Sequence, residues 1–143
     1  EELPSALIGK PAPSLAAIQS LGDRPAPTDA DLTAPGVKLV NFWASWCGIC
    51  RFTTPDVARL QSEGESVMTI ALRSGNDGEV SRWLSRKRVT FPVVNDSGGE
   101  ISRNWEISVT PTLVVVSKGQ VVSTTTGWTS YWGMKIRMWW AGV

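Results

Sequence analysis

Two cysteines separated by two residues lie in the segment Asn41-Phe42-Trp43-Ala44-Ser45-Trp46-Cys47-Gly48-Ile49-Cys50-Arg51. The almost continuously apolar residues 37–43 predict a buried strand, and a helix is predicted from about Cys47 to Gln61. At a helix start, unpaired N–H groups and the positive end of the helix dipole favour the thiolate of Cys47, and Arg51 adds a positive charge. Cys50, one turn further, is predicted to be less exposed and to resolve a mixed disulfide.

Three other roles are open to such a cysteine pair. A closed zinc site needs four ligands, and the chain has no histidine and no second cysteine pair, which argues strongly against zinc. Two inert core cysteines are disfavoured by their place at a helix start. A copper(I) site stays open, because two soft thiolates select that ion. The pair therefore predicts redox chemistry, with copper(I) binding as the alternative.

The composition is typical of a single globular domain. The 143 residues carry a net charge of +1 and are 42% hydrophobic, which argues against a disordered tail and against an electrostatic nucleic-acid binder. The longest aliphatic run, residues 113–116, is far shorter than the roughly 20 apolar residues of a membrane-spanning helix. Because the chain begins with Glu1 and not with methionine, we expect a processed or truncated form whose N-terminal signal or anchor lies outside it.

The chain divides into an extension and a core within one predicted domain. Residues 1–36 hold six of the nine prolines, which predicts a loop-rich extension with short extended pieces. Residues 7–8 and 15–18 are its apolar candidates for anchoring onto the core. Residues 37–143 form the predicted core.

The core pattern predicts a mixed sheet. Further strands are predicted at 67–72, 91–94, 112–117 and 120–126, and further helices at 76–88, 101–105 and 130–140. Asn76 with Glu79 forms a predicted capping box. This order of elements gives a parallel pair of strands extended by an antiparallel edge, with helices on both faces. The last helix carries four large apolar residues on one face, which we expect to be core: Trp132, Ile136, Trp139 and Trp140.

The segment 41–51, followed by Pro55, resembles the active-site segment of the thioredoxin superfamily, and Val109-Thr110-Pro111-Thr112 resembles its cis-proline loop. The similarity covers about residues 37–143 and implies an α/β, thioredoxin-like fold: a central mixed β-sheet flanked by helices, with an N-terminal loop/β extension. Residues 91–96 and the proline-rich extension are similar to the TlpA/ResA/DsbE-like branch of extracytoplasmic, usually membrane-anchored oxidoreductases. Within that branch, Cys-Gly-Ile-Cys and the histidine-free, tryptophan-rich core resemble the ScsD-type suppressors of copper sensitivity.

The resemblance implies a role for each matching residue. Cys47 is the expected nucleophile and Cys50 the resolving thiol. A cis peptide bond at Pro111 turns the backbone of the preceding residue toward the partner, which can then add as an extended strand. The expected substrate-binding residues are Trp46, Gly48, Ile49, Thr110 and Pro111, with Trp46 and Ile49 forming an apolar rim around the reactive sulfur.

Some residues depart from the family pattern. Thioredoxins proper carry a buried aspartate at the place of Asn41, and an asparagine cannot accept the proton of Cys50, so the proton acceptor stays open. Glu106 is a candidate for the missing acid, although a solvated carboxylate is the favoured interpretation. Gly-Ile between the cysteines, in place of Gly-Pro, leaves the reduction potential open. The basic run Arg82, Arg86, Lys87 and Arg88 is interpreted as a solvated helix end, in preference to a docking patch for an acidic partner.

The resemblance therefore implies a protein thiol–disulfide oxidoreductase in the periplasm or another extracytoplasmic space, tethered by an N-terminal membrane anchor. It needs no cofactor and no metal, because the two sulfurs store both electrons. The expected partners are protein thiol or disulfide substrates and a membrane redox partner that supplies or accepts electrons. The protein is expected to be monomeric and to bind no nucleic acid. The alternative function is a copper(I)-binding, copper-tolerance module that uses Cys47 and Cys50 as ligands.

Overall fold

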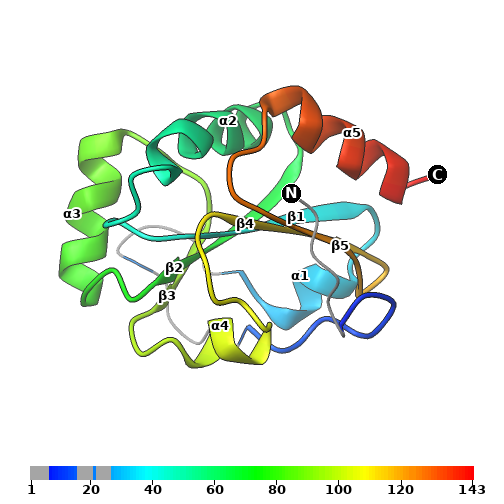
Figure 1. The fold of residues 1–143 in the computed structure, drawn as a ribbon, viewed down its shortest axis with the longest axis horizontal. Helices are drawn as coiled ribbons and strands as arrows, with labels where there is room; N and C mark the ends of the chain where they lie inside the picture. The colour runs from blue at the N-terminus through cyan, green and yellow to red at the C-terminus, as the bar shows by residue number, and fades with distance from the viewer. Residues whose placement is uncertain (1–6, 16–20, 22–26) are drawn as a thin grey trace.

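A five-stranded sheet in the order β3-β2-β1-β4-β5 forms the centre of the protein (Figure 1). The structure is a computed structural model that describes residues 7–15, 21 and 27–143. Within these residues the strands are β1 (Val37–Trp43), β2 (Ser66–Leu72), β3 (Val93–Asp96), β4 (Thr112–Ser117) and β5 (Gln120–Thr126), and the helices are α1 (Asp29–Thr33), α2 (Cys50–Ser62), α3 (Asp77–Lys87), α4 (Glu100–Asn104) and α5 (Tyr131–Ala141).

The strand β1 lies in the middle of the sheet, as its apolar sequence predicts, and every residue after Val37 is buried. It pairs in parallel with β2, which pairs in parallel with β3. On its other side β1 pairs antiparallel with β4, the first strand of the β4–β5 hairpin. Lys118 and Gly119 form the hairpin turn, both with positive φ, as a type I′ turn requires. The predicted mixed sheet is confirmed, with β3 as a third parallel strand.

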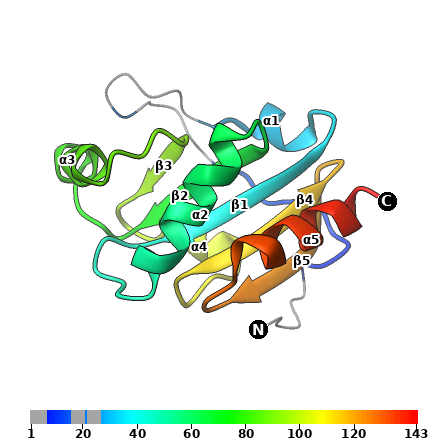
Figure 2. The same cartoon turned by 90° about the horizontal axis from the view of Figure 1, so that it is seen from above.

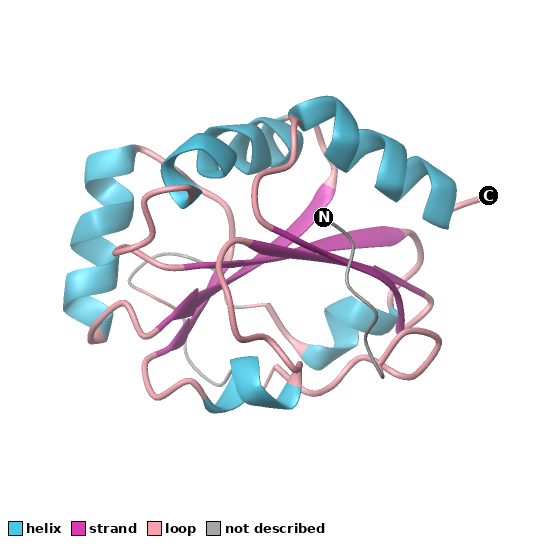
Figure 3. Ribbon diagram, in the orientation of Figure 1, coloured by secondary structure: helices cyan, strands magenta, loops and turns pink. Residues whose placement is uncertain are grey.

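Helices cover both faces of the sheet (Figures 2 and 3). Alternate side chains of β1 point to opposite faces, so Leu39 and Trp43 pack in one core and Val40 and Phe42 in the other. The first core lies under α2, α3 and α5, and the second is closed by α1 and α4. None of the described helices is both long and apolar enough to cross a membrane.

Residues 8–11 of the N-terminal extension run along β5, whereas residues 29–33 form the helix α1, which was not predicted. Ile8 forms a parallel bridge with Val121, and Pro11 an antiparallel bridge with Gln120. Leu15 is fully buried in the second core, as predicted for an anchoring residue. The other predicted anchors at positions 16–18 lie outside the described residues. The extension thus adds short extended pieces to the edge strand.

The predicted capping box of α3 is confirmed. The side chain of Asn76 accepts a hydrogen bond from the N–H of Glu79 (2.9 Å), and the Glu79 carboxylate accepts one from the N–H of Asn76 (3.1 Å). At the other end, Arg88 adopts the left-handed conformation that terminates the helix. Local sequence signals therefore define both ends of α3.

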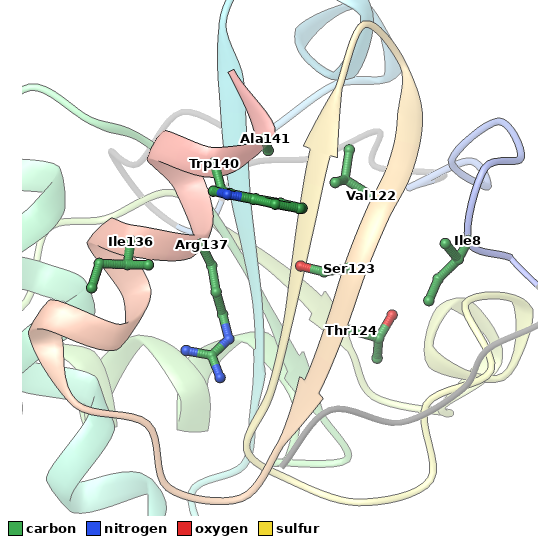
Figure 4. Close-up of a pocket in the computed structure, with 8 residues that line it drawn as sticks. All are labelled: Ile8, Val122, Ser123, Thr124, Ile136, Arg137, Trp140 and Ala141. Carbon is green, nitrogen blue, oxygen red and sulfur yellow. The ribbon is translucent and has the colours of Figure 1, made fainter. Parts of the chain in front are cut away.

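The predicted burial of the C-terminal tryptophans is wrong. The helix α5 buries Tyr131, Met134 and Met138 against the first core, and the face with Trp132, Ile136, Trp139 and Trp140 is exposed. Both faces of this helix are apolar, so spacing alone cannot show which one meets the sheet. A groove of about 720 Å³ lies between α5 and β5. Figure 4 shows Trp140 beside this groove, with Ile8 on the far side of β5.

Candidate active site

Cys47 and Cys50 lie where β1 leads into α2. The structure joins them in a disulfide, with their Cα atoms 5.4 Å apart. The helix begins at Cys50, three residues later than predicted, because Cys47 still belongs to a turn in which its N–H donates to the carbonyl of Ala44 (3.2 Å). Cys47 is half-buried and Cys50 is fully buried, so Cys50 is the less exposed of the two, as predicted.

The sulfur of Cys47 receives a hydrogen bond from the start of the helix. The backbone N–H of Cys50 donates to Cys47 Sγ over 3.2 Å. This N–H is one of the donors at a helix start that have no partner within the helix, and it lies at the positive end of the helix dipole. After reduction, both effects favour the negatively charged form of Cys47 over its neutral thiol.

The cis-proline loop faces this sulfur. The peptide bond Thr110-Pro111 is cis, as predicted. Cys47 Sγ lies 3.4 Å from the carbonyl oxygen of Thr110. In the disulfide the sulfur carries no proton, so this is a contact, whereas the reduced thiol can donate to the same oxygen. The structure therefore brings together residues that are 63 positions apart in the sequence.

Side-chain and backbone bonds hold the cis-proline loop in place. The Thr112 hydroxyl donates to the carbonyl of Val109 (2.7 Å), and the N–H of Gly127 donates to the carbonyl of Pro111 (2.9 Å). Thr110 itself is half-buried. Its position is thus fixed by the start of β4 and by the end of β5.

Apolar side chains are exposed around the cysteine pair. Trp46 is 63% exposed, although its indole N–H donates to the carbonyl of Arg73 (3.0 Å), and Ile49 and Gly48 are exposed beside it. Sequence reasoning missed the exposed Phe52, which its spacing of three residues from Ile49 could have indicated. It also missed the contact with Arg73, for which the sequence holds no signal.

Asn41 lies under the site as a buried polar residue. Its side chain is fully buried on the same face of β1 as Leu39 and Trp43, and neither its amide nitrogen nor its amide oxygen has a hydrogen-bond partner among the described residues. The neighbouring strand position holds Thr69, whose hydroxyl does have a partner, the carbonyl of Pro92 (2.8 Å). A buried amide without a partner destabilises the fold by its full desolvation cost.

Glu106, the other candidate acid, is exposed after the end of α4, with a φ of 59°. This placement agrees with the favoured interpretation as a solvated carboxylate. Within the described residues, no three histidine, cysteine, aspartate or glutamate side chains form a group that could hold a metal ion.

The chain is similar to a known family and to several known proteins. The family described as Redoxin matches residues 7–130. A thioredoxin-like protein of Haemophilus influenzae is 48% identical over 103 residues, which cover 72% of this chain and 62% of that protein. The thiol:disulfide interchange protein HelX of Rhodobacter capsulatus is 32% identical over 127 residues, which cover 87% of this chain and 71% of HelX.

The solved structures show the same fold. The thiol:disulfide interchange protein of the thioredoxin family from Chlorobium tepidum superposes with a TM-score of 0.78 at 23% identity, covering 99% of this chain and all of that one. The chain belongs to the Redoxin family and has the predicted thioredoxin-like fold. The predicted likeness to the TlpA/ResA/DsbE-like branch is also confirmed, since its relatives include proteins named DsbE and ResA.

A substitution of Asn41 tests the cost of its buried amide. Asn41→Leu removes an unpaired polar group, so we expect the free energy of unfolding to stay unchanged or to rise by about 1 kcal/mol. In the matched control, Thr69→Val removes a hydrogen-bonded hydroxyl and is expected to lower it by about 1 kcal/mol. Urea unfolding of both oxidised variants measures the difference, and a loss above about 2 kcal/mol for Asn41→Leu would show a partner that the structure lacks.

Proposed function

We propose that the protein is a thiol–disulfide oxidoreductase that reduces or exchanges disulfides in extracytoplasmic partner proteins. The observation that carries this proposal is the position of Cys47 Sγ. This sulfur accepts a hydrogen bond from the N–H of Cys50 at the helix start and lies 3.4 Å from the carbonyl oxygen of Thr110. The names of HelX and of the Chlorobium protein, which describe thiol:disulfide interchange, support it. Relatives extend beyond the matched region, which covers 62% of the Haemophilus protein, so the activity of the whole protein is part of the proposal.

The exchange proceeds in two steps. The Cys47 thiolate attacks one sulfur of a partner's disulfide, forms a mixed disulfide and releases the partner's other sulfur as a thiolate. Cys50 then loses its proton and attacks Cys47 Sγ, which releases the partner's second thiolate. The two cysteines are thereby oxidised to the disulfide seen in the structure, and the partner is reduced by two electrons. No cofactor takes part in these steps.

The partner chain binds beside the sulfur through backbone and apolar contacts. We assign its backbone pairing to Thr110, which precedes Pro111 and can offer its N–H and C=O to an extended segment. Trp46, Gly48 and Ile49 supply the apolar contacts, because they are exposed next to Cys47. Large apolar side chains of this kind commonly dominate the affinity of protein interfaces.

Location and partners are extensions of the same proposal. We place the protein in the periplasm or another extracytoplasmic space, tethered by an N-terminal anchor, where a membrane redox partner supplies or accepts electrons for a monomeric domain. The division into an extension, 1–36, and a core, 37–143, within this domain belongs to the proposal too. The copper(I) alternative and the ScsD-type assignment gain no support from the names of the relatives reported above, so no copper role is carried forward.

The two cysteines are expected to respond differently to substitution. Cys47→Ser removes the attacking sulfur and should abolish disulfide reduction, measured with insulin. Cys50→Ser leaves the mixed disulfide unresolved and should trap partners, measured as adducts on non-reducing gels that dithiothreitol releases. Insulin reduction by Cys47→Ser at the wild-type rate would contradict the assignment of the nucleophile.

The apolar rim is expected to contribute to the binding of protein substrates. Truncation of a buried interface tryptophan commonly costs 1–2 kcal/mol, so Trp46→Ala should lower kcat/KM for a protein disulfide by about tenfold. Reduction of a small disulfide such as glutathione disulfide should change much less. Trp140→Ala, at a residue that is 73% exposed on α5, is the matched control and should leave both rates unchanged. Equal losses of kcat/KM for Trp46→Ala and Trp140→Ala would refute a role of the apolar rim in substrate binding.

A further inference from the structure

A groove separates α2, at the top of Figure 1, from the C-terminal end of α3, at the left. It encloses about 290 Å³. One wall is the face of α2 that carries Arg51, Thr54, Pro55 and Ala58, at the i, i+3, i+4, i+7 spacing of a single helix face, and the other wall consists of Trp83, Lys87, Arg88 and Val89. We call this the basic groove.

Three cations line the basic groove, and no carboxylate does. They come from two separate elements, Arg51 from α2 and Lys87 with Arg88 from the end of α3. None of the three forms a salt bridge with any residue that the structure describes. The ammonium group of Lys87 lies 5.7 Å from the centre of the Trp83 ring, which forms part of the same wall. The groove therefore carries uncompensated positive charge next to an aromatic surface.

Helix stability explains only part of this charge. Lys87 lies in the last turn of α3, where a cation interacts favourably with the negative end of the helix dipole. Arg51 lies in the first turn of α2, at the positive end of the dipole, where a cation is unfavourable. The first turn of α2 contains no acidic residue to offset it. The dipole of its own helix therefore does not explain the position of Arg51, whose guanidinium carbon lies 4.9 Å from the centre of the Phe52 ring.

We propose that the basic groove binds an acidic segment of the substrate protein, next to the substrate's reactive cysteine. This inference rests on the proposed function. Arg51, which lines one end of the groove, directly follows Cys50 in the sequence. Charge complementarity selects carboxylate side chains, and the apolar wall from Ala58 and Val89 leaves room for their methylene groups.

The size of the groove limits where the acidic residues lie. From Arg51 to Ala58 the face of α2 extends over about 10 Å, at 1.5 Å per helical residue. An extended peptide rises about 3.3 Å per residue, so about three of its residues span the groove. We therefore expect the acidic residues within about four positions of the substrate's cysteine.

Two disulfide-linked peptides test the inference. They have the same sequence except for three glutamates or three glutamines on each side of the cysteine. The reduced protein reduces each peptide, and the tryptophan fluorescence of the protein gives the rate of this reaction. Wild type should reduce the glutamate peptide about fivefold faster at low salt, and the preference should fade at 0.5 M salt, as exposed charge pairs are screened.

Two double variants of α3 separate the groove from the general charge of the helix. Lys87→Gln with Arg88→Asn removes two groove cations, and asparagine tolerates the left-handed conformation at position 88. This variant should lose most of the preference for the glutamate peptide. Arg82→Gln with Arg86→Gln removes the same charge from α3 residues that do not line the groove, and should retain the preference. Reduction of the glutamine peptide at the wild-type rate shows that each variant is folded and active.

Three results would overturn the proposal that the basic groove binds an acidic segment. The first is that wild type reduces the two peptides at equal rates, and the second is that the two double variants lose the preference equally. The third is that millimolar inorganic phosphate abolishes the preference, which would indicate a site for small anions. Each of these leaves the proposed function intact, because the glutamine peptide is still reduced. Failure to reduce either peptide would instead refute the proposed function, and the basic groove with it.

Discussion

The hydrogen bond from the backbone N–H of Cys50 to the sulfur of Cys47 is the interaction on which the proposed chemistry of this protein depends. It exists because α2 begins at Cys50 and leaves that N–H without a partner inside the helix. The position of α2 depends in turn on β1, whose buried residues fix the point where the chain leaves the sheet. Burial of an apolar strand thus sets the electrostatic environment of a single sulfur atom.

Strand pairing explains why residues far apart in the sequence meet at this sulfur. Phe42, near the end of β1, pairs with Thr112 at the start of the antiparallel β4, so the cis-proline loop emerges at the same edge of the sheet as the cysteine loop. Trp43 pairs with Ala71 on the parallel β2, which brings the segment after Leu72 to that edge. There the carbonyl of Arg73 accepts a hydrogen bond from the indole N–H of Trp46. The site is a consequence of the sheet order.

Local signals in the sequence predicted most of the fold and the centre of the site. The apolar run of β1 and the capping box at Asn76 each depend on neighbouring residues, and both are confirmed. The exposed face of α5 was not predictable, because both faces of that helix are apolar. The basic groove was not predictable either, because Arg51 and Lys87 come together only through the packing of α2 and α3 onto one face of the sheet.

The redox equilibrium of the cysteine pair, titrated with dithiothreitol or glutathione and followed by tryptophan fluorescence, tests the central claim most directly. Trp43 and Trp46 lie close enough in the sequence to report the change. The account predicts one reversible two-electron transition, in which the ratio of dithiol to disulfide changes tenfold per about 30 mV, and a midpoint near about −270 mV would place the protein with the reducing thioredoxins. A pair that forms no reversible disulfide would contradict the account, and a potential near −120 mV would reverse the direction of electron flow.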